Sequence, residues 1–191
     1  MNCNQQLNGD TQKYLSRFYE ILDEMIRGMT CARLTESISH NFIVQMIPHH
    51  RAAIEMSESL LRYSDFAPLR RIAERIISEQ TQSIKDMEKA LPCCEMKMNS
   101  QQDLFRYGKR FGEITREMFS QMRSACSDNN INADFMREMI PHHQGAIRMS
   151  GNALKYPICP QLVPILKAII TSQERGVREM EKLLRQTECK K

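Results

Sequence analysis

Apolar residues recur every three or four positions along most of the chain, which is the spacing of one face of an α-helix. In the first such segment the apolar positions are Leu15, Phe18, Leu22, Met25 and Met29. This spacing predicts helices over about residues 11–30, 40–64 and 67–90. No segment shows the alternation of apolar and polar residues that a half-buried strand requires. The first half of the chain is therefore expected to be helical.

The second half of the chain repeats the first. The string Met-Ile-Pro-His-His at positions 46–50 recurs at positions 139–143, an offset of 142 − 49 = 93 residues. The offset also aligns aromatic, aliphatic and methionine positions before and after this string. We interpret the pattern as a tandem repeat, with helices expected over about residues 104–124, 133–155 and 160–185.

A single copy would bury one face of a helical hairpin and leave much apolar surface in water. Two copies can pair their long hairpins into a four-helix bundle, with the first helix of each copy as an additional, flanking element. The prediction is thus an all-α chain in which residues 1–100 form the first repeat and residues 101–191 the second. The first repeat ends in a linker over residues 92–100, and both halves pack as one domain.

Composition and charge exclude several classes of protein. Only 6% of residues are aromatic and the formal net charge is +4, with basic residues spread along the chain rather than clustered, so nucleic-acid binding is not expected. Charged residues interrupt every apolar run before it reaches the length of a membrane span. The first residues have neither the basic nor the apolar region of a signal peptide. We therefore expect a cytoplasmic protein, with export after removal of a signal as the alternative.

One face of the second predicted helix in each half carries the candidate chemistry. Each residue advances about 100° around a helix, which brings one set of side chains onto a third of the circumference. In the first half this face holds Met46, His49, His50, Ala53 and Met56. In the second half it holds Met139, His142, His143, Ala146 and Met149. The small alanines leave room between the larger side chains.

Methionine and histidine belong to the repeated pattern, whereas none of the seven cysteines recurs. Fourteen of 191 residues are methionine, and five pairs recur at the 93-residue offset: Met25 and Met118, Met29 and Met122, Met46 and Met139, Met56 and Met149, Met87 and Met180. Thioether sulfur with imidazole nitrogen suits Cu(I), whereas zinc sites use thiolate, imidazole and carboxylate. The two faces therefore predict metal binding, with copper favoured and zinc as the alternative. The competing interpretation is that the methionines only fill the core.

Several further residues are secondary candidates. Four methionines on the first helix of each copy fit the core and the site equally well: Met25, Met29, Met118 and Met122. The linker brings four soft donors together in a flexible segment, as a second Cu(I) site or as a plain exposed loop: Cys93, Cys94, Met96 and Met98. Gln80 and Gln173 lie on the apolar face of the third helices, where they could orient a ligating histidine or bond the backbone. The cysteines form no Cys-x-x-Cys pair and are expected to be reduced thiols.

At these residues the sequence resembles the family called domain of unknown function 305. The resemblance rests on Met-Ile-Pro-His-His-x-x-Ala-Ile-x-Met, found twice and followed each time by a helix with Gln and then Met seven residues later, over about residues 40–91 and 133–184. It implies a ferritin-like helical fold and a copper-binding role, since some members are exported copper-binding proteins implicated in copper resistance. The implied ligands are Met46, His49, His50, Met56, Met87, Met139, His142, His143, Met149 and Met180.

No pattern of an enzyme is found. A ferritin-type di-iron site needs two Glu-x-x-His motifs, and here Glu138 precedes His142 by four residues while its repeat counterpart is Gln45. We expect a non-enzyme that sequesters Cu(I), delivers it to a copper-transfer partner protein, or confers copper tolerance, and that can form oligomers. The alternatives are a helical interaction or scaffold protein without metal, and a zinc or Cu(II) protein that uses the histidine pairs.

Overall fold

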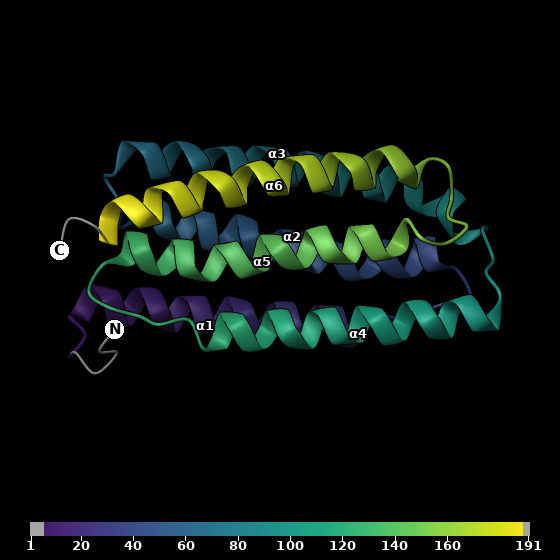
Figure 1. Ribbon diagram of the computed structural model, residues 1–191, viewed down its shortest axis with the longest axis horizontal. Helices are drawn as coiled ribbons and strands as arrows, with labels where there is room; N and C mark the ends of the chain where they lie inside the picture. Colours follow the sequence, from purple (N-terminus) through teal and green to yellow (C-terminus); the bar gives the residue numbers. More distant parts are fainter. Residues whose placement is uncertain (1–5, 189–191) are drawn as a thin grey trace.

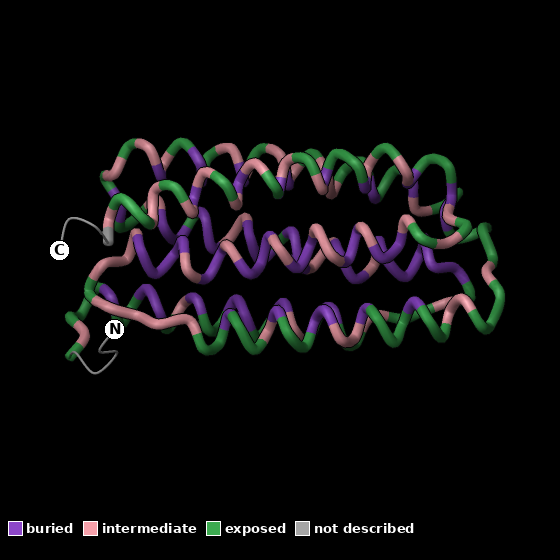
Figure 2. Tube along the Cα trace, viewed as in Figure 1, coloured by how far each residue is buried: buried purple, intermediate pink, exposed green. Residues whose placement is uncertain are grey.

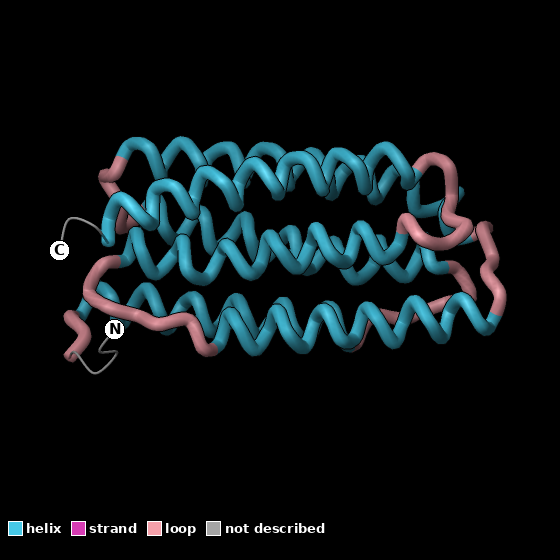
Figure 3. The backbone as a smooth tube through the Cα atoms, viewed as in Figure 1, coloured by secondary structure: helices cyan, strands magenta, loops and turns pink. Residues whose placement is uncertain are grey.

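Six helices account for most of residues 6–188, the part of the chain that the computed structural model describes. They are α1 (Gly9–Thr30), α2 (Ile38–Leu61), α3 (Ala67–Glu95), α4 (Gln101–Arg123), α5 (Ile131–Ala153) and α6 (Leu162–Glu188). Within this part of the chain there is no strand (Figure 3), and the prediction of an all-α fold is confirmed. None of the described helices is both long and apolar enough to span a membrane.

The helices stack in three layers of two: α3 with α6, α2 with α5, and α1 with α4 (Figure 1). Contacts join α2 to α3, α3 to α6, α6 to α5 and α5 to α2, while α1 covers α2 and α4 covers α5. Arg75 pairs with Glu179 and Glu79 pairs with Arg175, so α3 and α6 run antiparallel. This arrangement is consistent with a four-helix bundle flanked by one extra helix from each half.

The middle layer is the most buried part of the structure (Figure 2). The sequences explain why: α2 carries three charged side chains, Arg51, Glu55 and Glu58, whereas α3, which is five residues longer, carries ten. A helix with so few charged residues can be covered on two sides, while the outer helices keep charged faces toward solvent. The histidine-bearing segments lie in this middle layer.

The helix ends follow local capping chemistry. Asn8, Ser37, Ser100 and Asn130 each accept a hydrogen bond from a backbone N–H in the first turn of α1, α2, α4 and α5. The third helix differs from its prediction, because it continues through Pro92 to Glu95 and absorbs half of the expected linker.

The prolines beside the histidine pairs lie inside their helices. Both α2 and α5 continue through Pro48 and Pro141, so neither helix begins there. The ring of Pro48 is accommodated by Gly28 on α1, where a Cβ atom would lie 2.7 Å from the Cβ of Pro48.

Replacing Gly28 with alanine is expected to destabilise the protein, because the rigid proline ring cannot move away from the added methyl group. We expect the free energy of unfolding to fall by about 1–2 kcal/mol, the cost of overpacking less the better helix propensity of alanine. Gly108→Ala is the matched control, since a Cβ atom there meets no atom within 4 Å. The free energy of unfolding of this variant should rise by about 0.5–1 kcal/mol, because alanine has the better helix propensity. Urea denaturation of both variants measures the difference, and equal shifts would contradict the close packing of α1 on α2.

Candidate metal-binding site

The four histidines of the predicted faces meet where α2 packs against α5. His49 and His142 stack with ring centroids 3.7 Å apart and an interplanar angle of 27°. The ring of His50 lies 5.9 Å from that of His49. The ring of His143 lies the same 5.9 Å from that of His142. All four side chains are buried, so the two faces form one histidine cluster rather than two separate half-sites.

Burial keeps the four imidazoles neutral. It lowers the pKa of His50 to about 3 and that of His142 to about 4. Burial also holds the pKa values of His49 and His143 well below their usual range, and the charge that neighbouring histidines would carry lowers them further. Neutral imidazole is the form that binds a metal ion. Near neutral pH every ring in the cluster is therefore in its ligating form.

Five ring nitrogens of the histidine cluster are buried without a hydrogen-bond partner. They are His49 Nδ1, His49 Nε2, His50 Nδ1, His142 Nδ1 and His143 Nδ1. Two other nitrogens have partners: His142 Nε2 lies 3.2 Å from the carbonyl oxygen of His49, and His50 Nε2 lies 3.1 Å from Ser83 Oγ. Unpartnered buried polar atoms are rare in folded proteins and each costs roughly 1–3 kcal/mol. The concentration of five in one cluster marks a position where a ligand would be stabilised.

The two sides of the histidine cluster carry different residues at a pair of positions that the 93-residue offset aligns. Ser83 bonds His50, but the counterpart of Ser83 is Gly176. A Cβ atom at Gly176 would lie 2.8 Å from Cδ2 and 3.0 Å from Nε2 of His143, so a larger residue would displace that ring. Ser83 and Gly176 were not among the candidate residues, although each follows a candidate glutamine by three residues and the 93-residue offset aligns them.

The two glutamines that were candidates for orienting a ligating histidine lie in the groove between α3 and α6. Gln80 and Gln173 are buried beside each other between α3 and α6. Neither amide atom of Gln80 has a hydrogen-bond partner, and the Oε1 of Gln173 has none. Gln80 therefore does not orient a histidine ring; among the described residues Ser83 does so for His50.

The six methionines predicted as ligands are all buried, with at most 2% of each side chain exposed: Met46, Met56, Met87, Met139, Met149 and Met180. Met46 and Met139 precede the histidine pairs by one turn on α2 and α5. The methyl group of Met180 and the ring of His143 both lie against Gly176. The structure thus places at least Met180 directly beside the histidine cluster.

The four secondary methionines lie in the layer formed by α1 and α4. Met25, Met29, Met118 and Met122 are buried there. Met118 sits over Gly145 of α5, where a Cβ atom would overlap its sulfur. This contact is close packing between α4 and α5, which supports a core role for Met118.

The predicted cysteine–methionine loop does not exist as one unit. Cys93 and Cys94 lie in the last turns of α3, whereas Met96 and Met98 are 80% and 57% exposed. The helix continues past Pro92 and separates the thiols from the thioethers. Cys93 Sγ instead lies 3.7 Å from the sulfur of Cys159, a residue that the sequence analysis did not select.

The expectation of reduced thiols holds for four cysteines. Cys31, Cys93, Cys94 and Cys159 are free. It is wrong for Cys126, which is disulfide-bonded. Cys3 and Cys189 lie outside the described residues.

The buried carboxylate on α5 does not join the histidine cluster. Tyr14 donates a hydrogen bond of 2.8 Å to Glu138 Oε2, linking α1 to α5. Burial raises the pKa of Glu138 well above its usual value, although the bond from Tyr14 acts in the opposite direction. Glu138 therefore belongs to the core contact between α1 and α5, where burial favours its protonated form.

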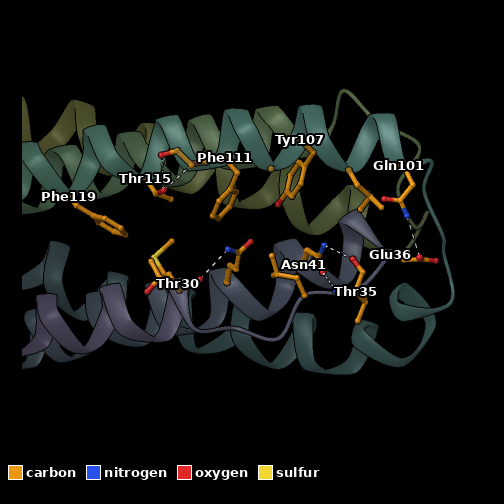
Figure 4. Close-up of a pocket in the computed structure, with 15 residues that line it drawn as sticks. Thr30, Thr35, Glu36, Asn41, Gln101, Tyr107, Phe111, Thr115 and Phe119 are labelled. Atoms are coloured by element: carbon orange, nitrogen blue, oxygen red, sulfur yellow. Dashed lines mark hydrogen bonds between the residues drawn. The ribbon is translucent and has the colours of Figure 1, made fainter.

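Two grooves flank the central layer. One of about 680 Å³ lies between α3 and α6 and reaches His50, Gln80 and Gln173. Another of about 530 Å³ lies between α4 and the segment joining α1 to α2 (Figure 4). Of the candidate ligands only Met29 lines the second groove, whereas His50 of the histidine cluster lines the first. Within residues 6–188, no three side chains among His, Cys, Asp and Glu form a group that could hold a metal ion.

Comparison with known proteins places the chain in a family. The model of a family described as "Domain of unknown function (DUF305)" matches residues 20–91 and 39–184. The chain belongs to the DUF305 family. The two matches overlap, so the family model does not by itself divide the chain into two copies.

A solved structure supports the fold of this DUF305 protein. The crystal structure of a DUF305 fragment from Deinococcus radiodurans is similar with a TM-score of 0.57 and 23% sequence identity. The match covers 78% of this chain and 96% of the fragment. No curated protein matches the chain. The resemblance seen in the Met-Ile-Pro-His-His motif is thereby confirmed at the level of the family.

Acidification is expected to destabilise the metal-free protein through the histidine cluster. Each histidine has a lowered pKa in the folded state, so the unfolded chain takes up protons first as the pH falls below the usual value of 6.5. The contribution of each neutral histidine to the free energy of unfolding is fully present above pH 6.5 and is lost as the pH falls toward 4. At pH 5 this loss amounts to roughly 2 kcal/mol per histidine. Urea denaturation between pH 7.5 and 4.5 measures this slope.

Glu138 opposes this trend, because its raised pKa makes its contribution greatest at low pH and smaller as the pH rises above 4.5. His50→Gln should therefore flatten the dependence on pH, and Glu138→Gln should make it steeper. Identical slopes for the wild type and His50→Gln would show that His50 is not held neutral by burial.

Proposed function

We propose that this DUF305 protein binds Cu(I) at the histidine cluster between α2 and α5, and that it sequesters or delivers copper or confers copper tolerance. The proposal includes a ferritin-like bundle of α2, α3, α5 and α6 that arose from two tandem copies. The ligands are drawn from His49, His50, His142 and His143 and from the buried methionines Met46, Met56, Met87, Met139, Met149 and Met180. The proposal assigns no reaction to the protein.

The unpartnered ring nitrogens carry this proposal. Five of them are buried in one cluster, and burial keeps the rings neutral. A metal ion would accept the electron pairs of such atoms, and a neutral ring need lose no proton to bind it. Because no three of the cluster's four histidines, all of them described residues, form a metal-binding group, the proposal takes its remaining donors from the buried methionines.

Thioether sulfur favours Cu(I) among the metals that imidazole binds. Methionine is a soft ligand, and zinc sites seldom use it. Met180 lies beside His143 against Gly176, so sulfur and nitrogen donors are available at the same place. Burial in the middle layer would shield a bound Cu(I) ion from water and oxidants.

Access from solvent is provided by the groove between α3 and α6. Ser83, Glu79 and Asp86 line it and His50 lies at its inner end. Lys167 and Arg175 line it as well, and Arg175 pairs with Glu79, so the charges along this groove balance. A storage protein and a copper-transfer protein both need a path of this kind, through which the ion is taken up and released.

The decisive experiment is an anaerobic titration with Cu(I) against a competing chelator. The wild type should withdraw Cu(I) from the chelator. The affinity for Cu(I) should fall at least roughly 10-fold in the variant His49→Ala/His50→Ala/His142→Ala/His143→Ala. This lower limit is the loss seen when a residue that only supports a metal ligand is replaced. His40→Ala is the matched control, because His40 lies at the start of α2 away from the histidine cluster and the aligned residue is Ala133.

Because four alanines leave a large cavity, the volume-conserving variant Met46→Leu/Met139→Leu tests the same site without one. It should retain the fold, as checked by circular dichroism, and bind Cu(I) more weakly. The affinity should change little between pH 7.5 and 5.5, because burial lowers the pKa of His50 to about 3 and that of His142 to about 4, and it should fall only as the pH approaches those values. Failure of the wild type to bind Cu(I), or tighter binding of zinc than of Cu(I), would overturn the proposal.

A further inference from the structure

A cluster of three sulfur atoms lies at the end of the bundle where α3 ends and α6 begins. Cys93 Sγ lies 3.7 Å from Cys159 Sγ, within hydrogen-bond distance for two sulfur atoms. Cys94 also hydrogen-bonds Cys159 through its side chain. Cys93 is exposed, while Cys94 and Cys159 are buried. An accessible thiol thus lies in contact with a protected one.

Hydrogen bonds hold the backbone of this thiol cluster in place. The backbone N–H of Cys159 donates to Ser39 Oγ over 2.8 Å. Ser37 Oγ donates to the carbonyl oxygen of Cys94 over 2.7 Å. Two serines at the start of α2 therefore hold the backbone of both segments that carry the thiols. The contact between the sulfur atoms is thus supported by hydrogen bonds from a third segment of the chain.

The surroundings of Cys159 favour its thiolate. The backbone N–H groups of Gln161 and Leu162, at the start of α6, hydrogen-bond its sulfur, as do the thiols of Cys93 and Cys94. These bonds lower the pKa of Cys159 even though burial acts in the opposite direction. Burial raises the pKa of Cys94 to about 12, so Cys94 stays protonated and acts as a hydrogen-bond donor.

We propose that Cys93 and Cys159 are a redox-active thiol pair that a low-molecular-weight disulfide oxidises to an intramolecular disulfide joining the end of α3 to the start of α6. The sulfur atoms need to approach by roughly 1.7 Å to reach the bond length of about 2.05 Å. Cys93 is exposed and can turn toward Cys159. The adjacent pair Cys93 and Cys94 is not the bonded pair, because the sulfur that Cys93 contacts belongs to Cys159.

Exposure, rather than acidity, assigns the order of the steps with oxidised glutathione as the oxidant. The contact with Cys159 raises the pKa of Cys93, but Cys93 is the exposed thiol that the reagent can reach, whereas Cys159 is buried. Cys93 Sγ attacks one sulfur of the reagent, whose S–S bond breaks; a mixed disulfide forms on Cys93 and one glutathione leaves as thiolate. Cys159 Sγ then attacks Cys93 Sγ, which forms the protein disulfide and releases the second glutathione. The protein pair loses two electrons and the reagent gains two. The protons of both protein thiols end on the two glutathione sulfurs.

Anaerobic incubation with oxidised glutathione followed by peptide mass spectrometry tests this pair. In the wild type we expect a cross-linked peptide containing Cys93 and Cys159, with two hydrogens lost and no glutathione retained there. Cys159→Ser should instead trap glutathione on Cys93, because the resolving thiol is absent. Cys93→Ser should leave Cys159 reduced, and Cys94→Ser should still form the cross-link.

Cys31, an exposed and free thiol, is the internal comparator, because its reaction with glutathione shows that the oxidant is competent. The proposal is overturned if Cys93 and Cys159 stay reduced while Cys31 has reacted. It is also overturned if the wild type retains glutathione on Cys93, or if the cross-link joins Cys93 to Cys94. These outcomes are independent of copper binding at the histidine cluster.

Discussion

The two halves of the chain pack against each other where His49 stacks on His142, between α2 and α5. His49 and His142 occupy corresponding positions in the two repeats, and their ring centroids lie 3.7 Å apart. The two halves of the chain therefore contact each other through corresponding residues. The ring nitrogen of His142 reaches the carbonyl oxygen of His49, but most of the remaining ring nitrogens of the histidine cluster lack partners. An apolar pair would pack there at lower cost. The fold therefore tolerates a destabilising centre in its most buried layer, which is typical of positions kept for binding.

Around this contact the two halves have diverged at specific positions. Ser83 and Gly176 differ, and only His50 gains a hydroxyl partner. Gln45 donates a hydrogen bond to the carbonyl oxygen of Met29 on α1, whereas Glu138 accepts one from Tyr14. Both replacements keep a polar contact between the middle layer and α1, but with different chemistry. The histidine cluster is consequently symmetric in its rings and asymmetric in the groups that surround them, so the two sides would not hold a ligand equally.

The sequence alone could predict the six helices and the faces of α2 and α5, because both follow from helical periodicity and from the 93-residue offset. It could not predict that His49 and His142 stack, since that depends on where two separate helices cross. The sequence also could not predict that Ser83, one turn further along α3 than Gln80, hydrogen-bonds His50. Cys159 was missed because it lies in a loop without a repeated partner, and only the packing of α6 beside α3 brings it to Cys93.

The helices α3 and α6 determine what reaches the middle layer. The groove between them ends at His50, and the ion pairs Arg75–Glu179 and Arg175–Glu79 cross it. These pairs are half-exposed, so each contributes little to stability and is weakened by salt. The thiol cluster lies at the end of the same two helices. Separation of α3 from α6 is therefore resisted by weak ionic contacts along the groove and by sulfur contacts at one end. If the proposed copper site is correct, an ion that enters by this groove would pass beside these contacts to reach His50.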